Sequence, residues 1–361
     1  MNWVKKEDMH QQHILIIGGG LSGLATALRL QEKGISFQIL EAQARLGGRI
    51  FTQKGIQNTP MDLGATWISE EHTTLLRLLE KLEIPVFEQF ASGTSYWRVS
   101  PSEPARPYPS SPPDVKSFRV EGGTDALLQA LENRLPSSSI QLQKVIQSIQ
   151  EEGNEVICTT RDGEVFRGTK VICTVSPEIL IHSVTFSPAL PLDLAQFMNY
   201  VQTWMSGSIK YAVEFSAPFW RERGFSGTAF SHVDIATEMY DHTDAENTTY
   251  SLMGFLNPKA VLMTELERRK AVLSQIRTLF GECDEFLLDY YEKVWNHEFV
   301  QVKEPKYLQS HQNNGHPILH KPQLGNKLYF SGTETSYNHP GYMEGAVVSA
   351  NRVYNQVLTD L

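Results

Sequence analysis

The stretch HILIIGGGLSGLATALRLQEKGISFQILE, residues 13–41, decides the fold class of this chain. Residues 13–17 are an uninterrupted apolar run bounded by glycine, which is typical of a parallel strand buried on both faces. Apolar residues then repeat at helical spacing over 21–28, and Gly34 predicts the C-cap of that helix. A second apolar run covers residues 37–40. The stretch therefore predicts a strand, a glycine turn, a helix and a second strand in one compact unit.

The glycines of this unit have the GxGxxG spacing of a dinucleotide-binding turn. Gly18 permits the tight turn, Gly20 lets the backbone approach a pyrophosphate, and Gly23 lets the helix pack against the strand. The helix N-terminus supplies unpaired N–H groups to the phosphates, and Glu41 accepts hydrogen bonds from ribose hydroxyls. The nucleotide-binding residues expected here are Gly18, Gly20, Leu21, Ser22, Gly23 and Glu41.

The segment after Glu41 separates FAD from NAD. It contains Arg45 and a second glycine turn, Gly47-Gly48-Arg49, for which a nicotinamide enzyme has no particular need. A flavoenzyme must also bind the far end of its cofactor. At these residues the chain resembles the FAD-dependent amine oxidase family, which includes monoamine oxidases, polyamine oxidases and L-amino acid oxidases. The resemblance implies that Arg45, Gly48 and Arg49 help to bind FAD.

Three further blocks extend the resemblance over most of the chain. They are MDLGATWIS (61–69), FRVEGGTDALLQAL (118–131) and KLYFSGTETSYNHPGYMEGAVVSANRVYNQVL (327–358), which contains the specific run GYMEG. The resemblance places Gly64, Ala65 and Thr66 along the isoalloxazine ring and the Val145 backbone on the adenine. It assigns the ribityl chain and the pyrimidine edge of the flavin to Gly332, Glu334, Tyr342 and Met343.

Three residues are expected to carry the chemistry: Lys210, Tyr342 and Trp295. On pattern alone, residues 209–215 alternate as a half-buried strand and Lys210 is an ordinary solvent-facing lysine. The resemblance instead assigns Lys210 to hold a water molecule against flavin N5. It also puts Trp295 near the flavin, although a core aromatic would look the same. Tyr342 matches one of two rings that sandwich the substrate amine.

The second ring of that sandwich falls near residues 305–307, where the chain departs from the family pattern, and Tyr307 is the candidate. Tyr240 resembles an aromatic residue of the substrate cavity, with a core role as the alternative. His339 is close to Tyr342 in sequence and is either a flavin-facing or a surface residue. Together, Tyr240, Tyr307 and His339 form the expected substrate pocket.

We expect a two-domain α/β protein with a Rossmann-like FAD-binding domain and a mixed sheet-plus-helix substrate domain. The FAD-binding domain takes residues 1–86, 118–200 and 298–361, and the substrate domain takes 87–117 and 201–297. The segment between Tyr96 and Phe118 is short and rich in proline, and prolines disfavour a packed helix because they lack N–H donors. The resemblance implies a long, mostly helical segment at this place in other family members, which this chain does not have. Substrates borrowed from the family are therefore open to question.

Composition excludes several partners. The net charge of -9 argues against nucleic acids and anionic membranes, and no apolar run is long enough to span a bilayer. The polar start favours a cytoplasmic location. The three cysteines, Cys158, Cys173 and Cys283, have no zinc spacing, and we expect no metal. None lies in the C-terminal region where animal monoamine oxidases link FAD, so non-covalent FAD is expected.

The function expected from the resemblance is FAD-dependent oxidation of an amine. A hydride passes to flavin N5, the imine is hydrolysed, and O2 reoxidises the flavin with release of H2O2. The partners are then a small-molecule amine and O2. Two alternatives stay open: a flavin-dependent desaturase or protoporphyrinogen-oxidase-like enzyme, and a flavin-binding protein without amine oxidase turnover.

Overall fold

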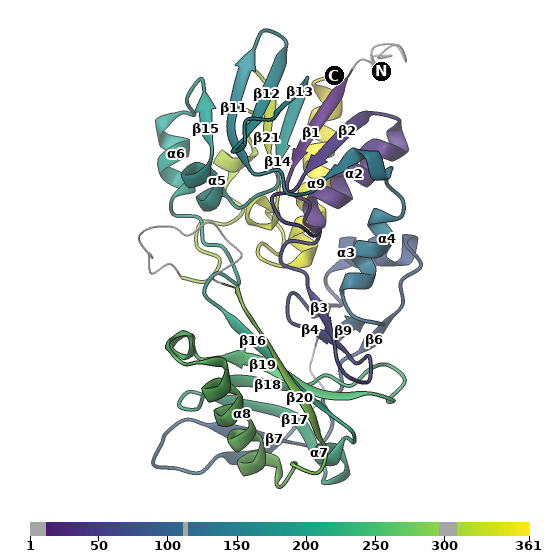
Figure 1. The fold of residues 1–361 in the computed structure, drawn as a ribbon, viewed down its shortest axis with the longest axis vertical. Helices are drawn as coiled ribbons and strands as arrows, with labels where there is room; N and C mark the ends of the chain where they lie inside the picture. Colours follow the sequence, from purple (N-terminus) through teal and green to yellow (C-terminus); the bar gives the residue numbers. More distant parts are fainter. Residues whose placement is uncertain (1–11, 111–114, 296–308) are drawn as a thin grey trace.

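The computed structural model describes residues 12–110, 115–295 and 309–361. Figure 1 shows two main parts, with a parallel sheet and its helices above and a larger, mostly antiparallel sheet below. Small sheets that contain β3, β4, β6 and β9 lie between them. Within the described ranges, no helix combines the length and the apolar composition needed to cross a membrane.

The upper part is built on five parallel strands among the described residues, in the order β10-β2-β1-β14-β21. Their bounds are β1 His13–Ile17, β2 Ser36–Leu40, β10 Ile140–Gln141, β14 Lys170–Cys173 and β21 Leu328–Phe330. The strand order reverses beside β1, and ligands of such sheets bind at the carboxyl ends of the strands at that point. The predicted α/β class is confirmed.

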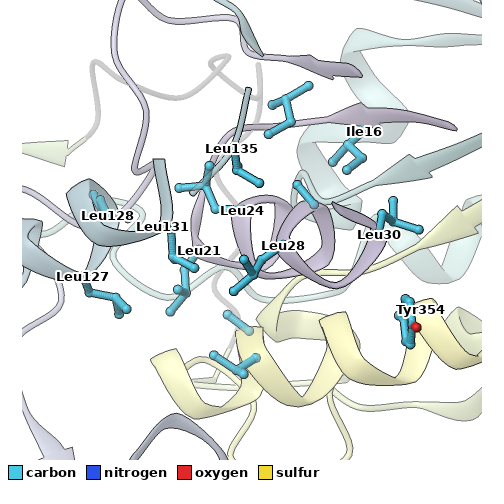
Figure 2. Close-up of a cluster of buried hydrophobic side chains, with 14 of the residues drawn as sticks. Ile16, Leu21, Leu24, Leu28, Leu30, Leu127, Leu128, Leu131, Leu135 and Tyr354 are labelled. Atoms are coloured by element: carbon cyan, nitrogen blue, oxygen red, sulfur yellow. The ribbon is translucent and has the colours of Figure 1, made fainter. Parts of the chain in front are cut away.

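Helices α2 (Leu21–Lys33), α4 (Asp125–Glu132) and α9 (Met343–Thr359) pack together on this sheet. Figure 2 shows leucines of α2 between the leucines of α4 and Tyr354 of α9. Each fully buried leucine contributes about 2 kcal/mol. The predicted C-cap is confirmed, because Gly34 is left-handed with φ 74° and its N–H donates to the carbonyl of Gln31.

A second sheet of the upper part has the order β13-β12-β11-β15. Its strands are β11 Ile146–Glu152, β12 Glu155–Thr160, β13 Val165–Gly168 and β15 Thr185–Ser187, and the adjoining helices are α5 Pro177–Ser183 and α6 Leu192–Met198. Strands β12 and β13 form a hairpin whose turn has three residues, although the Asp162-Gly163 pair is typical of a two-residue turn. The Thr160 N–H donates to the Glu164 carbonyl, which leaves Arg161, Asp162 and Gly163 between them.

The lower sheet has the described order β20-β16-β19-β18-β17-β7-β8, with α8 on one face (Figure 1). Its strands are β7 Thr94–Arg98, β8 Arg106–Pro109, β16 Ile209–Phe215, β17 Phe225–Ser231, β18 Ala236–Asp241, β19 Tyr250–Leu256 and β20 Leu287–Val294, and the helices are α7 Phe219–Glu222 and α8 Glu265–Phe280. Helix α8 begins with a capping box formed by Thr264 and Glu267 and ends at Gly281. Within the proline-rich segment, residues 106–109 form the edge strand β8, where missing N–H donors are tolerated.

One sequence expectation about β16 is wrong. All seven of its residues are buried, including the polar Lys210 and Glu214, so the strand is not half-buried. The face that the pattern assigned to solvent packs against the β4 segment, where Ala212 joins a cluster with Met61 and Leu63. A second layer of chain covers this face, and alternation within one strand carries no information about such a layer.

The connecting layer is held to β16 by a buried carboxylate. Its elements are β3 Thr52–Lys54, β4 Pro60–Asp62, β5 Ile68–Ser69, β6 Val86–Glu88, β9 Ser117–Val120 and α3 Thr73–Lys81. Glu214 accepts hydrogen bonds from the N–H groups of Ile56 (2.7 Å) and Gln57 (2.9 Å), and from the Thr59 hydroxyl. The β3–β4 hairpin is thereby fastened to the lower sheet.

Candidate active site

The first glycine turn follows β1 and begins α2. Gly18 has φ 106°, a region that favours glycine, and a Cβ on Gly23 would lie 2.1 Å from the Gly18 carbonyl oxygen. The second turn lies against the first, because the Gly47 N–H donates to the Gly19 carbonyl over 2.9 Å. A Cβ on Gly20 would find nothing closer than 3.9 Å. Two backbone segments without side chains thus meet at the N-terminus of α2.

Glu41 is buried at the end of β2, and both of its oxygens already accept backbone hydrogen bonds. Oε2 accepts from the Gly19 N–H at 2.6 Å, and Oε1 accepts from the Gln43 N–H at 2.8 Å. Each carboxylate oxygen has a second lone pair, so ribose hydroxyls remain possible donors. The half-buried Val145 lies nearby, since the N–H of Lys144 donates to the Glu41 carbonyl and the Val145 carbonyl accepts from Arg161.

The two arginines of the second turn make contacts with different parts of the chain. Arg45 donates to the carbonyl oxygens of Gly48 (2.8 Å) and Ile50 (3.0 Å), so it shapes the turn itself. Arg49 reaches across to the C-terminal block, where its Nη1 lies 2.7 Å from Oε1 of Glu334. The pair joins the second glycine turn to the segment that follows β21.

Glu334 provides a test of the expected cofactor. Its side chain is fully buried, and no hydrogen-bond donor in the described part of the chain satisfies either carboxylate oxygen; the contact with Arg49 is an ion pair without hydrogen-bond geometry. A buried carboxylate of this kind needs donors. The ribityl hydroxyls of FAD are such donors, and the side-chain-free space at Gly20 and Gly48 suits a pyrophosphate. The residues present therefore fit FAD.

The predicted Ser22 lies in a buried serine cluster whose other two members, Ser331 and Ser349, sequence reasoning did not identify. Ser22 of α2, Ser331 after β21 and Ser349 of α9 are buried together, with 2.8 Å between the hydroxyls of Ser22 and Ser331. The Gly332 N–H donates to the hydroxyls of Ser22 and Ser349, each at 3.1 Å. Ser22 thus binds the C-terminal block. Ser22 is more than 300 residues away from Ser331 and Ser349 along the chain, so only the fold brings it to them.

Helix α9 begins in the run GYMEG, with Tyr342 as its N-cap residue and Met343 buried. The carboxylate of Glu344 is fully buried and accepts from the N–H groups of Thr74 (3.0 Å) and Leu75 (2.6 Å). It therefore caps the N-terminus of α3, whose own N-cap residue, His72, makes no side-chain cap. The match to GYMEG did not predict this structural role.

Lys210 is buried with the loop that follows β4. Its Nζ donates to the Gly64 carbonyl at 2.7 Å and to the Thr66 hydroxyl, and it lies 4.8 Å from the ring centre of Trp67. Burial lowers its pKa to about 7, and the nearby carboxyl of Asp62 opposes that shift. Thus Lys210, Gly64 and Thr66, which are predicted site residues from distant parts of the chain, come together, with Ala65 between the last two.

The predicted aromatic residues flank this loop. Trp295 is fully buried and its indole N–H donates to the Leu63 carbonyl at 2.8 Å. The ring of Tyr240 lies edge-on to Trp67, with 4.8 Å between their centres, and its hydroxyl donates to Glu238. Both predicted residues therefore adjoin the segment that holds Lys210, and Trp67 is an additional aromatic neighbour.

Tyr342 is surrounded by histidines that were not all anticipated. His311 stacks on its ring at 5.5 Å, His72 lies at 5.5 Å, and the predicted His339 lies at 6.5 Å. Trp204 also stacks on His311, at 5.4 Å between the ring centres. The Tyr342 side chain is nevertheless half exposed. The remaining predicted residue, Tyr307, lies outside the described residues.

Comparison with known proteins places the chain in a family. The family model for flavin-containing amine oxidoreductases matches residues 21–117 and 112–358. The chain belongs to that family. Its cofactor is FAD, bound non-covalently, and its three cysteines are buried. The expected class of enzyme, a flavin-containing amine oxidase, is confirmed.

Individual relatives of this flavin amine oxidoreductase are named as flavin-containing amine oxidases. The mouse flavin-containing amine oxidase B is 23% identical, with 97% of this chain and 86% of that protein aligned. The rainbow trout (Oncorhynchus mykiss) flavin-containing amine oxidase is 24% identical, with 96% of this chain and 86% of that protein aligned. The mouse alignment runs over 459 residues, more than the 361 of this chain, so the relative contains segments that are absent here.

Solved structures show the same two-domain fold. Cyclohexylamine oxidase from Brevibacterium oxydans superposes with a TM-score of 0.84 at 19% identity, over 97% of this chain and 99% of that one. Wild-type putrescine oxidase bound to putrescine gives a TM-score of 0.80 at 19% identity, over 97% of this chain and 99% of that one. Both likenesses concern the fold.

Proposed function

We propose that this chain oxidises a small-molecule amine, with O2 as the final electron acceptor. When bound, FAD supplies the acceptor for a hydride from the carbon that bears the amine; the imine is hydrolysed in water and O2 is reduced to H2O2. The buried Lys210, held on the loop of Gly64 and Thr66, carries the proposal most directly. The family resemblance assigns that lysine and that loop to the flavin.

The residues proposed to hold FAD come from both ends of the chain. Gly20 and Gly48 leave room for the pyrophosphate at the N-terminus of α2, where unpaired N–H groups and the helix dipole favour an anion. Glu41 accepts from ribose hydroxyls and Glu334 from ribityl hydroxyls. Arg49 balances the charge of Glu334.

Lys210 is proposed to hold a reacting water molecule in place. An ammonium group has three donors, and two of them are used on Gly64 and Thr66. No third acceptor for Lys210 is found in the described ranges, which leaves one donor for the water that the resemblance assigns to this lysine. The aromatic faces of Trp67 and Phe255 limit access of other water to Nζ.

Tyr342 is proposed to orient the substrate amine. Loss of a hydride needs the neutral amine, and removal from water lowers the pKa of an amine. The half-exposed ring of Tyr342 offers one wall of such a site, next to His311. We also propose that Tyr240, Tyr307 and His339 line the pocket.

The division into domains is likewise a proposal. We assign residues 1–86, 118–200 and 298–361 to FAD binding and residues 87–117 and 201–297 to the substrate domain. The pairing of β7 from the first substrate segment with β17 from the second supports this assignment.

An anaerobic amine panel tests the function. The purified yellow protein is mixed with cyclohexylamine, putrescine and L-amino acids in turn, and the flavin absorbance is followed. Bleaching by one class, followed by H2O2 formation when O2 is admitted, is the expected result. A yellow protein that no amine bleaches would contradict amine oxidation and favour the desaturase-like or non-catalytic alternatives. The role of Lys210 is tested separately with the variant Lys210→Met. Lys170→Met, in β14 away from this site, is the matched control for that variant.

A further inference from the structure

A group of buried polar atoms without partners lies beside the segment that holds Lys210. We call it the polar cluster; it comprises Asp62, Arg119, Thr124, His242 and Thr243, none more than 2% exposed. Four of its atoms have no hydrogen-bond partner in the described part of the chain: Arg119 Nε, Thr124 Oγ1, His242 Nδ1 and Thr243 Oγ1. Buried polar groups are almost always hydrogen-bonded, so four unpaired atoms in one cluster call for a bound partner.

The members of the polar cluster are joined by hydrogen bonds. Asp62 accepts from the Thr124 N–H at 2.9 Å, and the Asp62 N–H donates to Nε2 of His242 at 3.1 Å. Arg119 donates to the Thr243 carbonyl. Because Nε2 of His242 accepts, the neutral ring carries its proton on Nδ1, which is the unpaired atom. Burial holds the pKa of His242 well below its ordinary value and so keeps the ring neutral.

One end of the polar cluster reaches Lys210. The Thr66 hydroxyl, which accepts from Lys210, lies 3.3 Å from the Asp62 carbonyl oxygen. The ionisable groups that act on Lys210 are Asp62 of β4, Arg119 of β9 and Glu238 of β18, and Lys293 of β20 is its partner across the strands. Burial raises the pKa of the Asp62 carboxyl, so that it takes up a proton more readily than an exposed aspartate.

The other end adjoins an open pocket of about 420 Å³. Its lining includes Pro60, Glu121, Gly122, Asp244 and Thr249. These residues are close neighbours in sequence of Asp62, Arg119, Thr124 and Thr243. Thr243 of the polar cluster is followed directly by Asp244 of the lining, so the cluster meets the wall of the pocket at this point.

We propose that ordered water molecules fill the polar cluster and form a route along which protons exchange between the Lys210 amine and the pocket at Glu121 and Asp244. A buried water makes about three hydrogen bonds to otherwise unsatisfied groups, which two N–H donors and two hydroxyls supply. Nζ transfers the proton of its hydrogen bond to the Thr66 hydroxyl, the hydroxyl passes its own proton to a water beside Asp62, and that water releases a proton toward the pocket. The charge of the polar cluster is unchanged by the transfer.

The use of this route in catalysis rests on the proposed function, whereas the route itself does not. A crystal structure of the FAD-loaded protein tests the water molecules directly. At least one ordered water bonded to two of the four partnerless atoms is expected. A dry cluster, or side chains that pair with one another, would overturn the proposal.

Proton exchange is tested with Trp67 as a reporter, because its ring faces the Lys210 amine. Fluorescence is followed after a microsecond pH jump across pH 7 without substrate, and Trp67→Phe identifies the signal. Thr243→Val and Thr124→Val remove only hydroxyls and should slow the relaxation by at least about tenfold. Thr237→Val, in β18, is the matched control, since its hydroxyl donates to the Phe255 carbonyl outside the cluster. Equal rates in all variants would refute the route, whether or not any amine is oxidised.

Discussion

The side-chain amine of Lys210 donates a hydrogen bond to the carbonyl oxygen of Gly64 over 2.7 Å, and so ties β16 to the loop after β4. The two residues are 146 positions apart in sequence. The contact joins the larger, mostly antiparallel sheet to the layer that separates it from the parallel sheet. A lysine that pattern assigns to solvent therefore becomes part of the proposed flavin-facing wall.

Replacement of Lys210 by methionine should keep FAD bound and slow oxidation of the reduced enzyme by O2. The methionine keeps the apolar stem but has no donor for Gly64, Thr66 or a water molecule. The loss should be about 10²-fold or more, the usual size of a proton-handling contribution. Stopped-flow absorbance after mixing with O2 measures it. Unchanged reoxidation kinetics would remove Lys210 from the mechanism.

The pH dependence of stability should also change in Lys210→Met. In the unfolded chain a lysine binds its proton up to about pH 10.4, whereas burial lowers the pKa of folded Lys210 to about 7. Between these values the unfolded state binds more protons, so the contribution of Lys210 to stability rises with pH. The wild type should therefore gain a few kcal/mol relative to Lys210→Met from pH 7 to 10. Denaturant unfolding of both proteins measures the difference; a flat difference would mean that the pKa of Lys210 is not lowered.

Two glycine substitutions in one turn should affect different properties, the stability of the protein in one case and FAD binding in the other. A Cβ on Gly23 meets the Gly18 carbonyl at 2.1 Å, so Gly23→Ala should destabilise the parallel sheet and its helix. A Cβ on Gly20 has no atom closer than 3.9 Å, so Gly20→Ala should fold but bind FAD more weakly. Thermal unfolding and FAD titration of the apoprotein separate the two effects. Tight FAD binding by Gly20→Ala would argue against the pyrophosphate at this turn.

Glu344→Ala should destabilise the protein through α3. The change leaves the N–H groups of Thr74 and Leu75 without their acceptor, at a cost of about 2–4 kcal/mol. Denaturant unfolding measures the loss, and Glu80→Gln on the exposed face of α3 is the control. A loss of FAD at unchanged stability would instead assign Glu344 to the cofactor.

Sequence reasoning identified the nucleotide-binding unit well and the substrate side less well. The strand, turn, helix and acid around Gly18 and Glu41 depend on contacts within about thirty residues, and periodicity and glycine spacing report such contacts directly. The burial of Lys210 depends on a second layer of chain over β16. No pattern within β16 reveals that layer, and only the family resemblance gave Lys210 a role other than that of a solvent-facing lysine.

Other features were missed for the same reason. The serine cluster at Gly332, the capping of α3 by Glu344 and the stacking of His311 on Tyr342 join segments remote in sequence. Serine, glutamate and histidine are common surface residues, and nothing in their local sequence marks these ones. The polar cluster at Asp62 and His242 also becomes visible only when four elements pack together.

By itself, the sequence determined the α/β class, the dinucleotide-binding turn and the end of α2 at Gly34, because these follow from short-range periodicity, caps and backbone freedom. Only the tertiary structure determined which polar groups are buried away from solvent. Burial depends on which distant segment covers a residue, and burial turns Lys210, Glu334 and Asp62 from ordinary charged side chains into groups with altered proton affinity or unmet hydrogen bonds.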